Sequence, residues 1–218
     1  MNPITIEPEQ PAKGCVIWLH GLGADGSDFI PVAEYMGLAA QHQYRVILPN
    51  APVRPVTINN GFPMPAWYDI LAMLPERQIA FADLQASADI VHQLIDEQIA
   101  KGVSSENILL VGFSQGGAVA YHSALSYPQR LGGIAALSTY IADYEALEPR
   151  LSKANKALPI WVAHGLMDDV VPMQLGEQAV TWLKAKQWPV EYKTYPMGHE
   201  VIEPQICDLG EWITGCLN

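Results

Sequence analysis

The sequence contains few cysteines, and their spacing matches neither a disulfide framework nor a zinc site. Only three occur in 218 residues, namely Cys15, Cys207 and Cys216, and no C-x-x-C pair is present. An odd and scattered set is typical of reduced thiols and not of a disulfide framework or a zinc site. We therefore expect each cysteine to be a small buried hydrophobic residue in a cytoplasmic protein.

Positive charge is also scarce. Lysine and arginine number 12 against 23 acidic residues, which gives a formal net charge of −11. Because no basic patch offsets this charge, nucleic acid and anionic lipid surfaces are disfavoured as partners. No run reaches the roughly 18 apolar residues that a membrane span needs. The start of the chain lacks the basic and apolar regions of a secretory signal, which also favours a cytoplasmic location.

The sequence does contain enough apolar residues for one full core. Half of the residues are hydrophobic, and a chain of this length buries roughly 70% of the surface that its unfolded form exposes. Most of its short apolar runs are continuous, as expected for strands covered by helices on both faces. The predicted strands cover residues 15–20, 45–49, 108–113, 133–138, 160–164 and 190–195. We therefore predict a single α/β domain over residues 1–218, with a doubly wound and mostly parallel sheet.

Helical patterns lie between these strands. Apolar residues at steps of three and four predict a helix over residues 82–100. The same spacing predicts a final helix over residues 204–217, and Pro204 is well placed to open it.

The stretch LLVGFSQGGAVAYHSAL, residues 109–125, places a serine between two glycines. The pattern G-x-S-x-G between a strand and a helix is the nucleophile elbow, in which a serine on a strained turn projects from the edge of the sheet. Glycines at 112 and 116 fit, because side chains there would collide with the neighbouring strand and helix. A serine helix cap is the alternative, but it leaves both glycines unexplained. We therefore predict that Ser114 is a nucleophile.

A serine hydroxyl is a weak nucleophile, so it needs a base that a carboxylate orients. In this arrangement the acid and then the base follow the serine, each after a later strand. His199 comes directly after the last predicted strand and is the predicted base, whereas His20 and His164 are interpreted as structural histidines. Asp168 and Asp169 both follow the preceding strand, and their position alone does not decide between them. No H-E-x-x-H or clustered His and Cys spacing predicts a metal site.

Acyl transfer also needs two backbone N–H donors for the oxyanion. One comes from the residue after the nucleophile, Gln115, and the other from the loop after an early strand. The glycine-rich stretch LHGLGADG, residues 19–26, offers the second donor, for which we choose Leu22. This stretch formally matches the G-x-G-x-x-G fingerprint, but the next strand ends in ILPN without the acidic residue that a dinucleotide site requires. We therefore expect an oxyanion hole and no dinucleotide.

Residues 49–75 interrupt the alternation of strands and helices. The segment holds six prolines and no clear period, and a connection of this length is usually functional or disordered. Its aromatic and thioether side chains argue against disorder, so we interpret it as an ordered loop over the active site, in place of a separate lid domain. Met64 and Trp67 are bulky enough to line a shallow substrate pocket there. The alternative is that they only anchor the loop to the core.

Five segments together resemble one known family. WLHGLGADG, MPAWYDI, GFSQGG, HGLMDDVVP and PMGHE look like the carboxylesterase and acyl-protein thioesterase branch of the α/β-hydrolases, in particular small bacterial carboxylesterases. The match covers nearly the whole chain in order. The resemblance implies an α/β-hydrolase fold, selects Asp168 as the acid, and maps the nucleophile, the base and the oxyanion donors onto Ser114, His199, Leu22 and Gln115. The family often has aspartate where this chain has leucine at position 166, which is outside the predicted triad.

The resemblance also implies an activity. Family members cleave carboxylic esters or S-acyl thioesters, need no cofactor and are typically homodimers. We therefore expect a serine carboxylesterase that hydrolyses small-molecule esters of short-to-medium acyl chain through an acyl-enzyme. An acyl-protein thioesterase or a lysophospholipase shares every catalytic residue and stays open as the alternative. If the chain were a non-enzymatic binding protein on the same fold, the presence of the serine, the aspartate and the histidine would be a coincidence.

Overall fold

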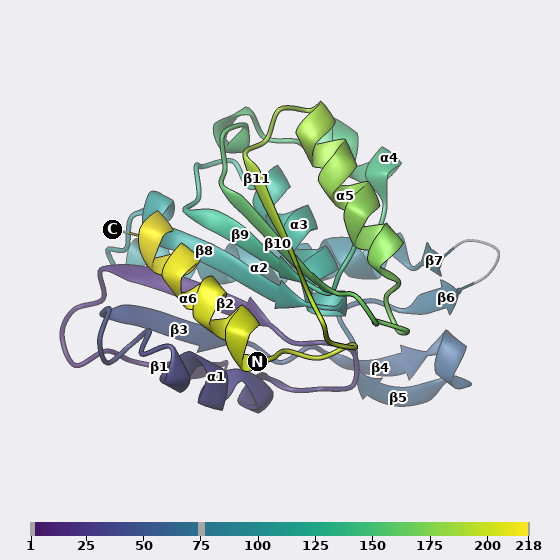
Figure 1. The fold of residues 1–218 in the computed structure, drawn as a ribbon, viewed down its shortest axis with the longest axis horizontal. Helices are drawn as coiled ribbons and strands as arrows, with labels where there is room; N and C mark the ends of the chain where they lie inside the picture. Colours follow the sequence, from purple (N-terminus) through teal and green to yellow (C-terminus); the bar gives the residue numbers. More distant parts are fainter. Residues whose placement is uncertain (1–2, 74–76, 218) are drawn as a thin grey trace.

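The computed structural model describes residues 3–73 and 77–217 and is built around a seven-stranded sheet (Figure 1). The strands lie in the order β1-β3-β2-β8-β9-β10-β11. All neighbours run parallel except β1 and β3, which pair antiparallel at one edge. The bounds are β1 Ile4–Ile6, β2 Gly14–Leu19, β3 Tyr44–Leu48, β8 Ile108–Phe113, β9 Gly133–Leu137, β10 Ile160–Gly165 and β11 Val190–Tyr195.

The helices lie between and after these strands. They are α1 Ile30–Tyr35, α2 Phe81–Ala100, α3 Gln115–Ser126, α4 Tyr144–Leu147, α5 Met173–Ala185 and α6 Glu203–Cys216. The six predicted strands and the two predicted helices are confirmed, each with ends within one residue of the expected bounds. The short strand β1 was not predicted, because three residues carry too little pattern to identify.

Helices cover both faces of the sheet, as the continuous apolar strands predict. In β2, Cys15 and Ile17 belong to the core that also contains buried residues of α2, α3 and α5. Val16 and Trp18 point to the opposite face and pack in the core that contains buried residues of α1 and α6. Successive strand residues thus enter two separate cores, and the predicted doubly wound architecture is confirmed.

The order of the strands reverses between β2 and β8. From β2 the sheet continues through β3 to one edge, and from β8 it continues through β9, β10 and β11 to the other. In open α/β sheets, ligands bind beyond the carboxyl ends of the strands at such a switch point. A binding or active site is therefore expected at the loops that follow β2 and β8.

Residues 49–73 are ordered, as predicted, but strands that were not predicted occur in this segment and shortly after it, and residues 74 and 75 lie outside the described residues. β4 (Val53–Val56) pairs with β5 (Phe62–Pro65), and β6 (Ile70–Ala72) pairs with β7 (Gln78–Ile79), in two antiparallel hairpins. Both hairpins lie beyond the end of the central sheet, on the right of Figure 1.

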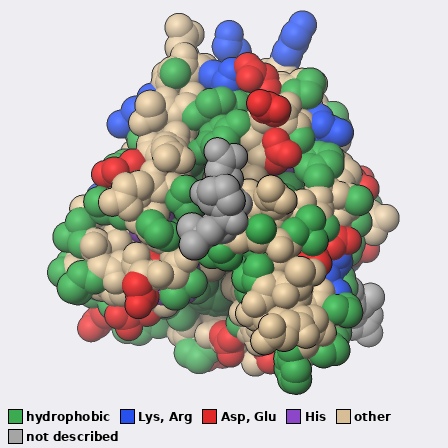
Figure 2. Space-filling view, turned by 90° about the vertical axis from the view of Figure 1, so that its right-hand side faces the viewer, with side chains coloured by type: hydrophobic (Ala, Val, Ile, Leu, Met, Phe, Trp, Pro, Cys, Tyr) green, Lys and Arg blue, Asp and Glu red, His purple; other side chains and the backbone are tan. Residues whose placement is uncertain are grey.

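Hydrophobic side chains are spread over the face that carries these hairpins (Figure 2). Large apolar residues are exposed in both hairpins and in the loop after β10. They are Val53, Phe62, Leu71, Met73, Leu166, Met167 and Val170. Within residues 3–73 and 77–217, no helix is long and apolar enough to cross a membrane.

The cysteines are free, and only Cys15 is buried as predicted. The expectation was wrong for Cys207, which is exposed on α6, and for Cys216, which is half-buried at the end of the same helix. A helix that packs on a sheet buries only one side, so its cysteines follow the helical period instead of their own hydrophobicity.

Candidate active site

Ser114 occupies a tight turn between β8 and α3. Its backbone has φ 54° and ψ −121°, and a positive φ is unfavourable for a residue with a side chain. A Cβ added at Gly112 would lie 2.4 Å from the carbonyl oxygen of Gly116, and one added at Gly116 would lie 2.4 Å from that of Leu19. Both glycines are therefore required, because β8 packs directly on the backbone of α3 at Gly112 and α3 packs directly on the end of β2 at Gly116.

The structure brings Ser114, His199 and Asp168 into one hydrogen-bonded chain. His199 Nε2 lies 2.9 Å from Ser114 Oγ, and His199 Nδ1 lies 2.8 Å from Asp168 Oδ2. The serine and the aspartate are each 8% exposed, so water competes little for these bonds. Phe113 packs against the imidazole with ring centroids 4.8 Å apart and restricts its orientation.

The two adjacent aspartates have different surroundings. Asp168 Oδ1 accepts hydrogen bonds from the backbone N–H groups of Val170 (3.0 Å) and Val171 (2.8 Å), which leaves Oδ2 for His199. Asp169 is exposed and points into a groove beside the site. The structure thus places Asp168, and not Asp169, against the histidine.

The histidines interpreted as structural are both fully buried. His20 Nδ1 lies 2.7 Å from the carbonyl oxygen of Gly21, and its Nε2 accepts from the N–H of Ala51 at 3.0 Å. His164 Nε2 lies 2.8 Å from the carbonyl oxygen of Val171 and 3.5 Å from Asp168 Oδ2. Burial lowers the pKa of both rings, so they are neutral at pH 7.

The loop after β2 turns toward Ser114. The N–H of Gly23 donates to the carbonyl oxygen of Pro65 at 2.8 Å, which ties this loop to the first hairpin. Among the described residues, no acceptor binds the N–H of Leu22 or that of Gln115, the first residue of α3. Two free N–H donors beside the hydroxyl are what an oxyanion requires.

The side chain of Gln115 has a structural role that is separate from its backbone N–H. Its Oε1 accepts from the N–H of Trp67 at 2.8 Å, and its Nε2 donates to the carbonyl oxygen of Tyr68 at 2.7 Å. The indole N–H of Trp67 in turn donates to the carbonyl oxygen of His20 at 2.9 Å. The turn at Ser114, the proline-rich segment and the β2 loop are thereby joined through buried hydrogen bonds.

This arrangement corrects the prediction for the substrate pocket. Trp67 is fully buried in the core and cannot contact a substrate, so the alternative that it anchors the segment is the correct one. Met64 is half-buried, and its Sδ would lie 3.7 Å from a Cβ built at Gly23, so it packs behind the β2 loop. Neither side chain lines the two cavities that flank Ser114.

A small cavity opens directly at Ser114. It has a volume of about 280 Å³, and Ser114 and His199 lie in its wall. The remaining lining residues are Gly21, Leu22, Ala24, Asp28, Phe29, Phe113 and Val170. Sequence reasoning missed Phe29 and Val170, because nothing in their local pattern separates a cavity wall from a core position.

A larger groove of about 770 Å³ lies next to the small cavity, and Val170 lines both. Its wall combines apolar side chains with charged and amide groups. The lining residues are Met73, Arg77, Tyr140, Ile141, Ala142, Tyr144, Asp169, Val170, Pro172, Leu175 and Gln178.

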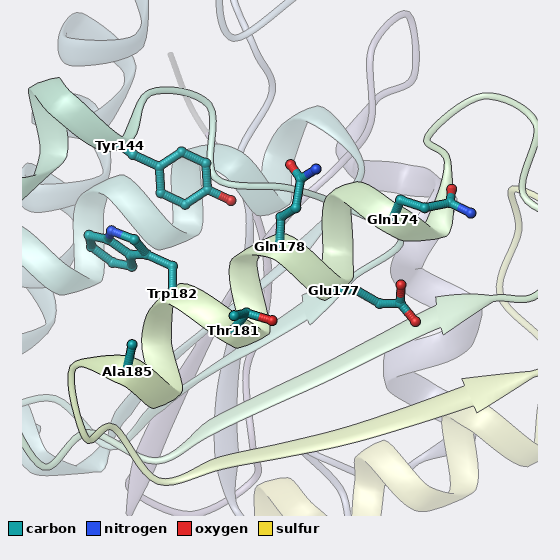
Figure 3. A pocket seen from close by; sticks show the side chains of 7 residues that line it. All are labelled: Tyr144, Gln174, Glu177, Gln178, Thr181, Trp182 and Ala185. Carbon is teal, nitrogen blue, oxygen red and sulfur yellow. The ribbon is translucent and has the colours of Figure 1, made fainter.

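A third hollow, of about 600 Å³, follows the outer side of α5 (Figure 3). Tyr144 and Trp182 close one end, and Gln174, Glu177 and Thr181 point away from the helix along the rest. It contains neither the serine nor the histidine, so it holds no reacting group. In the described part of the chain, no group of three or more His, Cys, Asp or Glu side chains is placed to hold a metal ion.

Comparison with known proteins gives consistent matches. The sequence pattern of the Phospholipase/Carboxylesterase family matches residues 1–217. A probable carboxylesterase of Oryza sativa subsp. japonica is 34% identical over 204 residues, which cover 92% of this chain and 77% of that protein. Acyl-protein thioesterase 1 of Eremothecium gossypii is 38% identical over 204 residues, which cover 91% and 86%. The crystal structure of Arabidopsis thaliana SOBER1 has a TM-score of 0.88 at 31% identity, over 94% of this chain and 99% of that one.

Proposed function

Because this chain belongs to the phospholipase/carboxylesterase family, we propose that it is a serine carboxylesterase that hydrolyses short-to-medium-chain esters through an acyl-enzyme. The hydrogen-bonded chain from Ser114 through His199 to Asp168 is the single observation that carries this proposal. A serine, a base and an orienting acid at these distances are the groups that two-step acyl transfer needs.

In the first step, Ser114 Oγ attacks the acyl carbonyl carbon and transfers its proton to His199 Nε2. Asp168 accepts the hydrogen bond of His199 Nδ1–H and stabilises the imidazolium that forms. The N–H groups of Leu22 and Gln115 bind the oxyanion. Loss of one such donor costs about 3 kcal/mol of barrier lowering.

In the second half of the reaction, His199 gives its proton to the leaving alkoxide, and the alcohol departs. Water then attacks the acyl-enzyme with His199 as the base, and the carboxylic acid is released from Ser114. Because His199 must reach the leaving oxygen, we assign the 280 Å³ cavity that it lines to the alcohol. The acyl chain then extends into the 770 Å³ groove.

The composition of this groove supports the chain-length preference. Each buried CH₂ contributes roughly 0.8 kcal/mol while it contacts apolar surface, which Ile141, Val170 and Leu175 supply. Arg77 and Asp169 interrupt that surface. A plain hydrocarbon chain long enough to reach these charges gains less from further methylene groups, so short-to-medium chains are favoured.

An acyl-protein thioesterase or lysophospholipase activity is the second candidate. The 38% identity to acyl-protein thioesterase 1 of Eremothecium gossypii favours it, together with a groove that is large for a short acyl group. Both activities would use the same residues, since an S-acyl thioester presents the same carbonyl carbon to the serine.

The proposal also includes a cover over the active site, a homodimer and a cytoplasmic location. Residues 49–75 would form the cover of the active site, supported by the Gly23–Pro65 and Trp67–Gln115 hydrogen bonds. The exposed apolar side chains of that face would support a homodimer, which light scattering of the purified protein would test. The three free cysteines suit a cytoplasmic location.

A fluorophosphonate probe tests the nucleophile. We expect stoichiometric labelling of Ser114 and turnover of p-nitrophenyl butyrate, both abolished in Ser114→Ala with an unchanged circular dichroism spectrum. Labelling that survives in the variant would overturn the assignment. The relative kcat/KM for butyryl and palmitoyl oxygen esters and for an S-palmitoylated peptide then decides between the two activities.

A further inference from the structure

Arg77 is a charged residue in the wall of a groove that otherwise suits an acyl chain. Its guanidinium carbon lies 4.1 Å from the centroid of the Tyr140 ring. Tyr140 is 5% exposed, and its hydroxyl shares a 2.7 Å hydrogen bond with that of Tyr68, which is fully buried. The ring is therefore a rigid platform that fixes the plane of the guanidinium.

This arginine has no internal counterion among the residues that the structure describes. Arg45 and Arg54 lie within salt-bridge distance of Glu7 and Asp83, respectively. No described carboxylate lies within 4.0 Å of Arg77, and no described acceptor receives a hydrogen bond from it, although the chain has 23 acidic residues. Stacking covers one face of a guanidinium and leaves its in-plane N–H donors available.

The nearest charge of opposite sign in the groove belongs to Asp169. This side chain is exposed and lies outside salt-bridge distance of Arg77. The groove therefore combines apolar contacts at Ile141, Val170 and Leu175 with one fork of donors that stacking on Tyr140 holds in place. A planar guanidinium binds a carboxylate through two parallel hydrogen bonds.

We propose that Arg77 binds a carboxylate at the far end of the acyl chain, so that half-esters of dicarboxylic acids are preferred substrates. This inference rests on the proposed ester hydrolysis at Ser114 and specifies its substrate class. The methylene groups of the diacid would lie along the apolar part of the groove. Its terminal carboxylate would replace the water that solvates Arg77.

Matched aryl esters test this idea. p-Nitrophenyl monoesters of glutaric, adipic and pimelic acid are compared with the corresponding terminal carboxamides, which have the same shape without the charge. We expect at least one carboxylate ester to be preferred by wild type. In Arg77→Gln, the ratio of kcat/KM for carboxylate over carboxamide should fall about 10- to 100-fold, the usual range for a charged hydrogen bond.

Two further variants separate a local contact from the general effect of charge. Arg150→Gln removes the same charge from an arginine that stacks on Phe81 outside the groove, and it should leave the ratio unchanged. Asp169→Asn removes a negative charge from the groove and should raise the ratio. Arg77→Lys keeps the charge but loses the planar fork, so its ratio should fall between those of wild type and Arg77→Gln.

The outcomes distinguish this inference from the proposed function. Equal turnover of carboxylate and carboxamide esters by wild type, or equal ratios in Arg77→Gln and wild type, overturns the role of Arg77 and leaves the esterase intact. If no ester is hydrolysed and Ser114 is not labelled by fluorophosphonate, the esterase itself is wrong.

Discussion

Replacing Gln115 by methionine should destabilise the protein although the size of the side chain is kept. The change removes two buried hydrogen bonds, to the N–H of Trp67 at 2.8 Å and to the carbonyl oxygen of Tyr68 at 2.7 Å. A buried polar group left without a partner costs about 1–3 kcal/mol, so the free energy of unfolding should fall by about 2–6 kcal/mol. For a chain of this size, that loss lowers Tm by about 4–24 °C.

Activity should fall as well, because the same segment orients the oxyanion loop. The indole of Trp67 holds the carbonyl oxygen of His20, two residues before Leu22. If that support loosens, kcat for p-nitrophenyl butyrate should fall more than KM changes, at a temperature where both proteins are folded. The backbone N–H that we assign to the oxyanion is retained, so the loss tests positioning alone.

Gln205 provides a matched control for this experiment. It is 1% exposed in α6, and neither polar atom of its side chain has a partner among the described residues. Gln205→Met should therefore leave stability unchanged or raise it, since no hydrogen bond is lost. Urea unfolding measures all three proteins. A Gln115→Met variant within about 0.5 kcal/mol of wild type, a difference typical of neutral surface changes, would refute the reasoning.

Two other predictions follow from the same geometry. Asp168→Asn should lower kcat about 10³-fold or more through loss of the histidine tautomer, whereas Asp169→Asn should cost far less, and the reverse ranking in kcat would contradict the assignment. Burial lowers the pKa of His122 from 6.5 to about 4. As pH falls from 6.5 to 4, this histidine is therefore protonated in the unfolded chain but stays neutral in the folded one, which favours unfolding. Urea unfolding across that range should show a loss on the order of 3 kcal/mol that is absent in His122→Gln, and parallel curves for the two proteins would exclude this explanation.

The sequence predicts the central sheet well because its signals are local. Continuous apolar runs identify most of the six long strands, and the helical period identifies α2 and α6. The family expected from five short segments is confirmed by the match over residues 1–217. Ser114 and His199 could be predicted as neighbours because each follows a strand, and parallel strands bring their carboxyl ends to one edge. Asp168 and Asp169 share that position, so the choice of Asp168 came from the family resemblance.

The proline-rich segment could not be predicted in the same way. Proline normally argues against a strand, yet Pro55 of β4 lies directly opposite Pro63 of β5. Such a pair suits the positions of an antiparallel ladder that exchange no hydrogen bonds, because neither residue has an N–H to donate. The hydrogen bonds that hold Trp67 in place come from His20 and Gln115, which are 47 and 48 residues away in the sequence. No local pattern reports contacts over such distances.

The strands that precede Ser114 and His199 differ in how many neighbouring strands hold them in the sheet. Ser114 follows β8, which has a neighbour on each side, whereas His199 follows β11, which among the described strands pairs only with β10 at the edge. Besides that pairing, the side chain of Tyr195 holds β11 to α6 through a 2.6 Å hydrogen bond to Asp208. Opening of this one edge would separate the base from the nucleophile while the interior of the sheet stays folded. If Ser114 and His199 act as proposed, we therefore expect local opening at this one strand to abolish activity before the protein unfolds.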